Sequence, residues 1–460
     1  MTHPPLSDRQ DFHAFLDAYR SGFPGDVLAF AEAVSADQEI TGIVWELAAQ
    51  GRDPLLVFDR VDGVAVKVVT SVFSSRQRIA RMLGVDSARI HEEYQARARR
   101  ACPPRVVASG PILDSVEQHS IDIAAAVPML KHFETDRAPY VTSGIIVAED
   151  PRTGAGNLSY HRCMVHSPAE LATSLHSRGH LWRLLQAAAD SRRELPVALV
   201  IGAHPLFMLA ASARVPMGVD ERDIAGGLFG RPLDVVRTPK YGIGVPAAAE
   251  YVLEGVIDPR AHAEEGPFGE FTGYSSNRTT NNCLRVETIL RRRDAMLVDV
   301  AGGNSAEHLN LGRIPRESEM AETLRERFPG VTALHYPASG THFHAYVALR
   351  QMRQGEARQV MLALLGWDPY LKTVVAVDAD VDVTRDDQVL WALATHFQPH
   401  LDVVIVDGLP GSALDPSASG IGTTSRMGLD ATRGIGFEGV RARISERART
   451  RAAEILGRTR

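Results

Sequence analysis

The middle of the chain, from about residue 110 to residue 310, consists of short apolar runs that glycine and proline separate, and this texture restricts the fold more than any other feature. Such runs fill residues 121–127, 140–148, 158–165 and 284–290. They are typical of strands joined by turns, because an amphipathic helix needs a longer segment with helical periodicity. We therefore expect a largely β central domain with a few inserted helices.

The chain on either side mixes helices with strands. Residues 9–35 are predicted to be largely helical, because apolar side chains recur at helical spacing from Phe12 to Tyr19. Beyond Pro315 we expect a helix from Glu317 to Phe328 and then alternating strands and helices, which is typical of an α/β domain. The 460 residues exceed one ordinary core. The expected parts are an N-terminal α/β domain (1–109), a central domain (110–314), a C-terminal α/β domain with a Gly-rich segment (315–439) and a terminal helix (440–460).

Composition excludes several classes of protein. The formal net charge of −6 argues against a dedicated nucleic-acid binder. The three cysteines are far apart and form neither a metal-binding pattern nor a disulfide framework, so we expect the reducing cytoplasm. The N-terminus lacks the apolar run of a signal peptide. Gly202 and Pro205 interrupt the longest apolar stretch, residues 196–213, so no membrane span is expected.

Two carboxylates of the central region, Glu265 and Glu270, flank the sequence Gly-Pro-Phe-Gly. On a regular strand their side chains would point to opposite faces. Proline fixes its own φ, and glycine reaches backbone angles closed to other residues, so a tight kink can bring both carboxylates to one side. Such a pair can separate its pKa values and leave one group available as a proton donor. The alternative is a solvated acidic turn.

A mixed set of oxygen and nitrogen ligands lies in the same region. Asn157, His180 and Glu221 offer an amide oxygen, an imidazole and a carboxylate, which together suit manganese or magnesium when phosphate oxygens complete the shell. The alternative is three unrelated polar residues, which spacing alone does not exclude. His342 and His344 would share a strand face, but without a third ligand we interpret them as structural.

One generic cofactor motif fails in its context. Residues 242–247 match the GxGxxA dinucleotide fingerprint. However, the preceding segment is a poor buried strand, and Pro246 stands where the phosphate-facing helix should begin. We therefore do not expect a Rossmann site.

The motifs together resemble those of a known family. In chain order they are Asn157-x-Ser159-x-x-Arg162, His180, Pro216-x-Gly218-Val219-x-Glu221 and Glu265-Gly266-Pro267-Phe268-Gly269-Glu270. This pattern resembles the UbiD family of prenylated-FMN-dependent (de)carboxylases, in particular the bacterial members that act on aromatic and heteroaromatic acids. Residues 11–16, 252–255 and 424–432 are also similar to the family, so the resemblance covers nearly the whole chain.

The resemblance implies a fold and a set of site residues. The central domain would be a split β-barrel that binds the flavin, and the C-terminal α/β domain would serve oligomerisation. Arg162, Glu265 and Glu270 would be catalytic. Asn157, His180 and Glu221 would hold the divalent ion. The cofactor-binding residues would be Asn157, Ser159, Tyr160, His161, Arg162, Gly179, His180, Glu221 and Arg426. Some relatives carry lysine in place of Arg426, but arginine also binds phosphate.

The resemblance also implies a reaction. It is the reversible, non-oxidative decarboxylation of an aromatic, heteroaromatic or α,β-unsaturated acid through a covalent adduct with prenylated FMN, in which Glu270 donates the proton. Mn²⁺ or Mg²⁺ would clamp the cofactor phosphate, and K⁺ is a further candidate ion. A separate flavin prenyltransferase would supply the cofactor, and the protein would form a homodimer or a higher oligomer.

Substrate identity depends on weaker signals. Phe271 follows the proton donor and is a candidate pocket wall, as is Asn304. His308 and Arg316 resemble a segment of the aromatic-acid members, and a second positive group there would hold the far carboxylate of a dicarboxylic acid. The alternative for these residues is packing against the neighbouring domain. Two rival functions also stay open: a split-barrel reductase that uses ordinary FMN, and a flavin-binding or assembly protein without activity.

Overall fold

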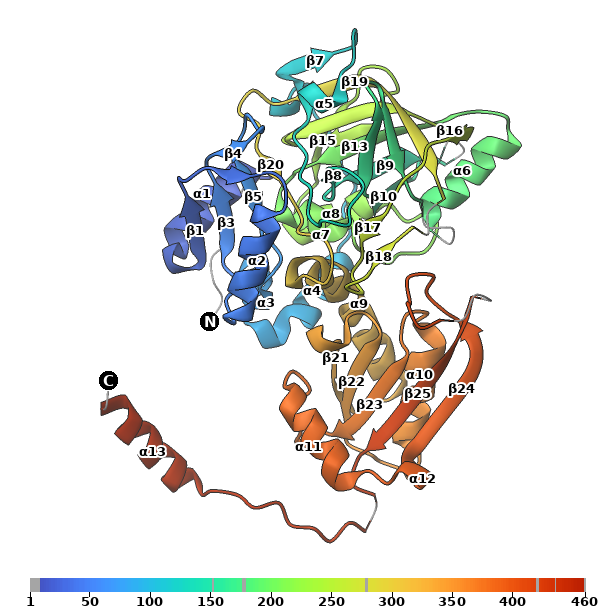
Figure 1. Cartoon of the computed structure of the whole chain (residues 1–460). Coiled ribbons are helices and arrows are strands. Elements are labelled where there is room, and N and C mark those ends of the chain that lie inside the picture. The colour runs from blue at the N-terminus through green and yellow to red at the C-terminus, as the bar shows by residue number, and fades with distance from the viewer. Residues whose placement is uncertain are drawn as a thin grey trace.

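The computed structural model describes residues 9–150, 153–175, 179–277, 280–418, 422–434 and 436–458. Figure 1 shows three folded parts in chain order, with the C-terminal helix α13 (Glu446–Arg458) lying apart from them. The mixture of helices and sheets confirms the predicted α/β class. In the part of the chain that is described, no helix is both long enough and apolar enough to span a membrane.

The N-terminal part contains a four-stranded sheet in the order β1-β3-β5-β20, of which the last strand returns from beyond the central domain. Its elements are α1 (Phe12–Gly22), β1 (Val27–Phe30), β2 (Val34–Ser35), α2 (Glu39–Ala49), β3 (Leu55–Phe58), β4 (Val61–Asp62), β5 (Val68–Thr70), α3 (Arg76–Met82), α4 (Ile90–Ala98) and β20 (Leu297–Val298). The β5–β20 pairing carries the segment after residue 298 past the N-terminal domain toward the central cavity.

The central part is built on an antiparallel sheet of nine strands among the described residues, in the order β10-β9-β13-β16-β19-β12-β11-β8, with β7 paired to β19. Its strands are β7 (Ser115–Glu117), β8 (Tyr140–Val141), β9 (Ile145–Glu149), β10 (Gly156–Tyr160), β11 (Cys163–Ser167), β12 (Glu170–Thr173), β13 (Leu195–Ile201), β16 (Tyr251–His262) and β19 (Asn282–Arg291). Shorter elements are β6 (Arg105–Val106), α5 (Ile123–Ala126), α6 (His180–Asp190), α7 (Pro205–Ala210), α8 (Glu221–Phe229), β14 (Asp234–Arg237), β15 (Gly244–Pro246), β17 (Phe268–Gly269) and β18 (Ser275–Ser276).

The inner strands of this sheet are buried on both faces, which explains their unbroken apolar sequences. In β9, Ile145 and Val147 pack into one hydrophobic cluster, while Ile146 and Ala148 pack into a second cluster. Strand β13 alternates between the same two clusters. Because side chains alternate across a sheet, a strand covered on both sides needs apolar residues at every position.

The C-terminal part has a five-stranded sheet in the order β21-β22-β23-β25-β24. Helices α9 and α10 share a hydrophobic cluster with this sheet, and α11 contributes to a second one. The elements are α9 (Ala306–Arg327), β21 (Val331–His335), β22 (His344–Leu349), α10 (Glu356–Trp367), β23 (Thr373–Asp378), α11 (Asp386–His396), α12 (Pro399–Asp402), β24 (Val403–Pro410) and β25 (Thr423–Ala431).

Three local predictions are wrong. Helix α1 ends at Gly22 and strands β1 and β2 follow, so residues 9–35 are not largely helical. The apolar run at 121–127 contains the short helix α5, capped by the Asp122 side chain, and not a strand. Helix α9 begins at Ala306 and continues through Pro315, whereas the predicted helix begins at Glu317. Residues 244–246 form a strand, in agreement with the rejected Rossmann site.

Candidate active site

The Glu265–Glu270 segment is a kinked turn that leads into the short hairpin of β17 and β18. Gly266 has a φ of +93°, in the left-handed region where a side chain would be strained. Its N–H donates to the Tyr140 hydroxyl at 3.1 Å, and the Gly269 N–H donates to the Asp136 carboxylate at 2.8 Å. These contacts fix the turn at both ends.

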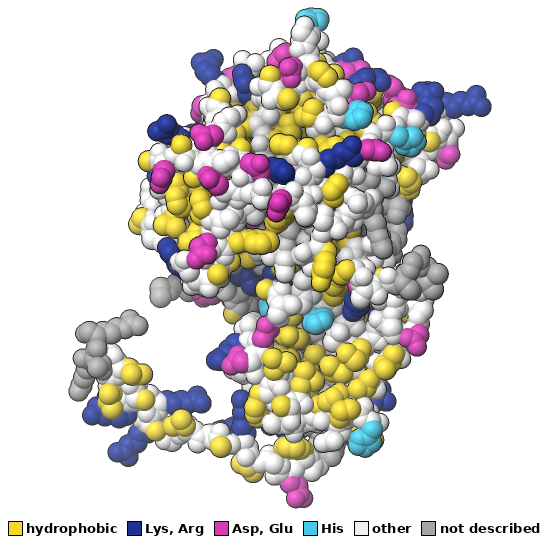
Figure 2. Space-filling view, in the orientation of Figure 1, with side chains coloured by type: hydrophobic (Ala, Val, Ile, Leu, Met, Phe, Trp, Pro, Cys, Tyr) yellow, Lys and Arg dark blue, Asp and Glu magenta, His cyan; other side chains and the backbone are white. Residues whose placement is uncertain are grey.

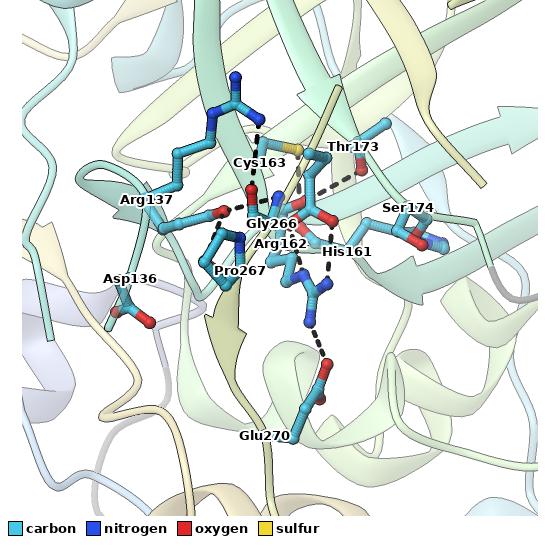
Figure 3. Close-up of polar contacts among 12 residues, drawn as sticks. Asp136, Arg137, His161, Arg162, Cys163, Thr173, Ser174, Gly266, Pro267 and Glu270 are labelled. Atoms are coloured by element: carbon cyan, nitrogen blue, oxygen red, sulfur yellow. Dashed lines mark hydrogen bonds and ion pairs between the residues drawn. The ribbon is translucent and has the colours of Figure 1, made fainter. Parts of the chain in front are cut away.

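The two carboxylates of this turn meet on the guanidinium of Arg162, which lies between β10 and β11 (Figure 3). Arg162 Nε and Nη2 donate to the two oxygens of Glu265 at 2.6 and 2.9 Å, and Nη1 donates to Glu270. The Arg162 Cζ atom also lies 4.6 Å from the centroid of the Phe268 ring. The predicted trio is therefore one connected group, in which arginine holds both carboxylates by separate edges of its planar fork.

The environment of this trio favours a proton donor at Glu270. The side chain of Glu265 is completely buried, while those of Glu270 and Arg162 are 8% and 13% exposed. Burial raises the pKa of Glu270 above its usual value, the charge of Arg162 opposes this shift, and the charges of Glu265 and Asp136 reinforce it. Arg162 and Glu270 both line a cavity of about 500 Å³. A carboxyl group whose proton is retained more strongly than usual thus faces the space where a ligand would bind.

The predicted metal ligands also come together. Asn157 lies on β10, and its amide nitrogen donates to Glu221 Oε1 at 3.1 Å. The Leu158 N–H donates to the second oxygen of Glu221 at 2.8 Å. His180 begins α6 and lines the same cavity of about 660 Å³ as Asn157 and Glu221.

The chemistry of these residues fits a divalent cation. The Asn157 Oδ1 atom is buried and accepts no hydrogen bond from the described residues, so a ligand position is available. Burial lowers the pKa of His180, which favours the neutral imidazole that binds metals. Within the described ranges, no three His, Cys, Asp or Glu side chains form a metal cluster. The candidate metal ligands include only two residues of these types, His180 and Glu221, because the third ligand is the amide oxygen of Asn157.

We predict that the stability of the metal-free protein depends on Glu221. Burial raises the pKa of Glu221 from 4.5 to about 7. Because Glu221 stays protonated in the folded state to a higher pH than in the unfolded state, its contribution to the free energy of unfolding is fully present below the unfolded-state pKa. This contribution, about 3 kcal/mol at most, is lost as the pH rises through about 7. The melting temperature should fall between pH 5 and pH 8, and it should fall less in Glu221→Gln. Manganese should stabilise the wild type at pH 8 but not the variant; equal stabilisation of both proteins would contradict this site.

Four further cofactor-binding candidates, Ser159, Tyr160, His161 and Gly179, lie in the walls of these cavities. His161 Nδ1 donates to the Ser174 carbonyl oxygen at 3.0 Å, which leaves Nε2 to accept from the Ser159 hydroxyl at 2.9 Å. The Tyr160 hydroxyl donates to the Met208 carbonyl oxygen at 2.9 Å. Ser159, Tyr160 and Gly179 line the larger cavity, and Tyr160 and His161 line the smaller one. The two cavities share wall residues that include Thr142, Tyr160 and Glu270, so they lie next to each other.

The candidate substrate residues divide into two groups. Phe271, His308 and Arg316 line the larger cavity, and the Phe271 ring lies 6.3 Å from that of His308. Asn304 is exposed and is not among the residues that line either cavity. Arg316 is buried and its guanidinium pairs with Asp368 through two hydrogen bonds, so its charge is already balanced within the chain.

Arg426 does not join the other cofactor-binding candidates. It lies on β25 of the C-terminal domain, and its guanidinium donates to the carbonyl oxygens of Leu365, Asp368, Pro369 and Pro410. Pro369 lines the larger cavity. The contacts of Arg426 are therefore those of a residue that holds a cavity-lining loop in place.

The sequence analysis missed several residues that shape the site. Asp136 anchors the Glu265–Glu270 turn, Tyr370 lines both cavities from the C-terminal domain, and Arg214 and His342 line the larger one. No local motif marks Asp136 or Tyr370, because each acts through a contact with a distant segment. His342 was considered with His344 as a metal pair on one strand face and was interpreted as structural, and neither interpretation placed it at the cavity.

Comparisons with known proteins identify the family. Residues 23–98, 105–305 and 309–431 match the N-terminal, Rift-related and C-terminal domains of the family of 3-octaprenyl-4-hydroxybenzoate carboxy-lyase, UbiD. Anhydromevalonate phosphate decarboxylase of Aeropyrum pernix is 34% identical over 88% of this chain and 91% of its own length. Phenolic acid decarboxylase of Sedimentibacter hydroxybenzoicus is 29% identical over 92% of this chain and 91% of its own.

Solved structures agree with this assignment. The UbiD-class enzyme HmfF from Pelotomaculum thermopropionicum, in complex with FMN, has a TM-score of 0.89 and 33% identity, over 95% of this chain and 98% of that one. The closed form of vanillic acid decarboxylase from Sedimentibacter hydroxybenzoicus has a TM-score of 0.83 and 27% identity, over 97% of this chain and 99% of that one. The chain belongs to the UbiD family of carboxy-lyases.

Proposed function

We propose that the protein decarboxylates an aromatic, heteroaromatic or α,β-unsaturated acid, reversibly and without net oxidation, with prenylated FMN bound in the central cavity. The observation that carries this proposal is the Arg162 guanidinium held between Glu265 and Glu270 at the cavity wall. Relatives of several substrate classes share the fold: one curated relative is named for anhydromevalonate phosphate and another for phenolic acids. Carbon dioxide release from a panel of acids will identify the individual substrate.

The cofactor and the side chains around it would have separate roles in this reaction. Prenylated FMN, when bound, supplies the electron sink for the pair released with carbon dioxide. Arg162 orients the substrate carboxylate beside it through its positive charge and through the N–H groups of Nη1 and Nη2 that Glu265 and Glu270 do not use. Glu265 is bidentate on Arg162 and fixes its direction. Glu270 delivers a proton to the carbon that loses carbon dioxide, and takes one up in the reverse direction.

The cofactor phosphate would be held through a metal ion. Asn157, His180 and Glu221 suit Mn²⁺ or Mg²⁺, and the unpartnered Asn157 oxygen supports this assignment. K⁺ is proposed only as an accessory ion. Related structures contain FMN or prenylated FMN. Since the proposed cofactor is a prenylated flavin, a separate flavin prenyltransferase is the expected partner enzyme.

We also propose that the protein forms a homodimer or a higher homo-oligomer in the cytoplasm. Apolar side chains gather on the C-terminal domain in Figure 2, and Leu390, Leu401 and Ile405 are exposed there. Helix α13 lies away from the domains and exposes Ile455 and Leu456, which a second subunit would cover. The three cysteines are free thiols, as suits a reducing compartment.

The direct test measures carbon dioxide release from a panel of aromatic, heteroaromatic and α,β-unsaturated acids. Protein co-expressed with a flavin prenyltransferase should release carbon dioxide from at least one acid, whereas protein loaded with plain FMN should not. Nicotinamide oxidation by the FMN-loaded protein, without carbon dioxide release, would instead establish the reductase alternative.

We predict that Asp136 positions the catalytic turn. Asp136→Ala leaves the buried N–H groups of Gly269 and Phe133 without their acceptor, so Glu270 should shift and kcat should fall about 10-fold or more. Asp136→Asn keeps an acceptor oxygen for only one of these two N–H groups and removes a charge that raises the pKa of Glu270. Its kcat at low pH should therefore fall less than that of Asp136→Ala, while the loss of activity at high pH should begin at a lower pH. Asn and Ala variants with identical pH profiles would contradict this role.

A further inference from the structure

A buried carboxylate that belongs neither to the trio nor to the metal set lies behind the cavity wall. Asp299 directly follows β20, and its side chain is 3% exposed. Its Oδ1 atom accepts a hydrogen bond from the Thr142 hydroxyl at 2.8 Å. Thr142 lines both cavities, and so does Val300, the residue after Asp299. Asp299 itself is not among the residues that line either cavity, so it contacts the wall from behind.

The N-terminal domain supplies most of the surroundings of Asp299. The Asp299 N–H donates to the Val69 carbonyl oxygen of β5 at 2.8 Å. The Thr70 hydroxyl, also on β5, lies 3.3 Å from Asp299 Oδ2. His132 Nε2 lies 3.3 Å from Oδ1, and His132 Nδ1 lies 2.9 Å from the Thr41 hydroxyl of α2. Contacts within the chain therefore fix both the backbone and the side chain of Asp299.

The titratable groups around Asp299 favour its role as a hydrogen-bond acceptor. The Thr70 hydroxyl also lies 3.0 Å from Glu307 Oε2, and its single proton serves only one of the two carboxyl groups at a time. Burial raises the pKa of Glu307 to about 7, and the charge of Asp299 adds to this shift. A protonated Glu307 can donate to the Thr70 oxygen, which leaves the Thr70 proton for Asp299. Burial alone would lower the pKa of His132, but the charge of Asp299 raises it overall and favours the imidazolium beside the carboxylate.

Thr142 occupies a part of the wall that a bound flavin would pass. The metal candidates line the larger cavity, Arg162 lines the smaller one, and Thr142 lines both. A flavin with its phosphate at the metal candidates and its ring at Arg162 would therefore extend past Thr142. Since the Thr142 hydroxyl donates its only proton to Asp299, this bond favours one rotamer of the side chain.

We propose that Asp299 is a positioning residue for the flavin, which fixes the rotamer of Thr142 and the course of the chain at Val300 and so holds the cavity wall in its binding shape. This inference rests on the proposed function and extends it to a residue outside the cavity. It also gives the N-terminal domain a part in cofactor binding, because β5 holds Asp299 by its backbone N–H and by the Thr70 hydroxyl.

The test is a double-mutant cycle on the full chain, in which flavin fluorescence gives the dissociation constant of FMN. FMN is the probe because a related structure contains it. The cycle consists of Asp299→Asn, Thr142→Val and the double variant, since valine has nearly the size of threonine but no hydroxyl. Thr142→Ser keeps the hydroxyl. Asp59→Asn is the matched control, because Asp59 is an exposed carboxylate next to β3 of the same sheet and pairs with Lys67. The melting temperature of each protein is recorded as well.

Asp299→Asn and Thr142→Val should each weaken FMN binding about 10-fold. The double variant should bind within about two-fold of the weaker single variant, because both changes remove the same hydrogen bond. Thr142→Ser and Asp59→Asn should stay within about three-fold of wild type. The role is excluded if neither single change alters the dissociation constant by more than about two-fold, or if the two effects multiply in the double variant.

Two further outcomes separate this role from a purely structural one and from the proposed function. A lower melting temperature in Asp299→Asn with unchanged FMN binding would show that Asp299 only stabilises the fold. If Asp299→Asn does not fold, Thr142→Val decides: weaker FMN binding that Thr142→Ser does not share supports the role, and unchanged binding excludes it. A wild type that binds FMN and gives the predicted cycle, but releases no carbon dioxide with the prenylated cofactor, would count against the decarboxylase and not against Asp299. A wild type that binds no FMN would contradict both.

Discussion

Glu270→Gln is expected to reduce kcat by about 10²- to 10⁴-fold, the range typical of a lost general acid. Glutamine has nearly the same shape and keeps an oxygen that accepts the hydrogen bond of Arg162, but it has no proton to deliver. The fold and the cofactor site should survive, because Glu270 lies outside the metal set. The measurement is carbon dioxide release at saturating substrate, with bound flavin quantified for each protein.

The matched control is Glu264→Gln, one residue from the trio. Glu264 is exposed and pairs with Arg137 on the surface, so its loss should change kcat by less than about two-fold. Comparable losses in both variants would show that the segment tolerates no change of charge. Full activity in Glu270→Gln would remove this residue from the proton-transfer step.

Arg162→Lys should reduce kcat/KM by about 10²-fold, although the charge is retained. The guanidinium donates to Glu265 from Nε and Nη2 and to Glu270 from Nη1, and a single ammonium cannot reproduce this fork. The substrate carboxylate and Glu270 would both lose their alignment. Steady-state kinetics with one accepted acid provides the test.

For comparison, Arg137→Lys replaces an exposed arginine whose ion pair with Glu264 a lysine can retain. Its kcat/KM should stay within about two-fold of wild type. If Arg162→Lys behaves in the same way, the planar fork has no special part in the reaction, and a simple positive charge is sufficient.

The sequence correctly predicted those strands that contain an unbroken run of apolar residues. Strands β9, β13 and β19 follow from runs that are buried on both faces. Helix α9 was predicted too short because Pro315 normally marks a helix start or break, yet the structure continues the helix through it. Residues 24–35 turn into strands because β1 pairs with β3, a contact that local periodicity does not reveal.

The site was predictable where a motif carries the chemistry. The Gly-Pro-Phe-Gly spacing indicated that Glu265 and Glu270 could share one side, and the structure joins both to Arg162. Arg426 illustrates the limit, because the family resemblance suggested that it binds the cofactor phosphate, whereas its guanidinium donates to backbone carbonyl oxygens such as that of Asp368. Tyr370 and Arg214 reach the cavity only through the packing of two domains, which no pattern in either segment records.

The most direct test of the account is decarboxylation of an accepted acid in deuterium oxide, with the product analysed by mass spectrometry and NMR. Non-oxidative decarboxylation with Glu270 as the proton donor predicts one deuterium at the carbon that lost carbon dioxide, and loss of this product in Glu270→Gln. A hydroxyl group at that carbon, or deuterated product formed at the wild-type rate by Glu270→Gln, would contradict it.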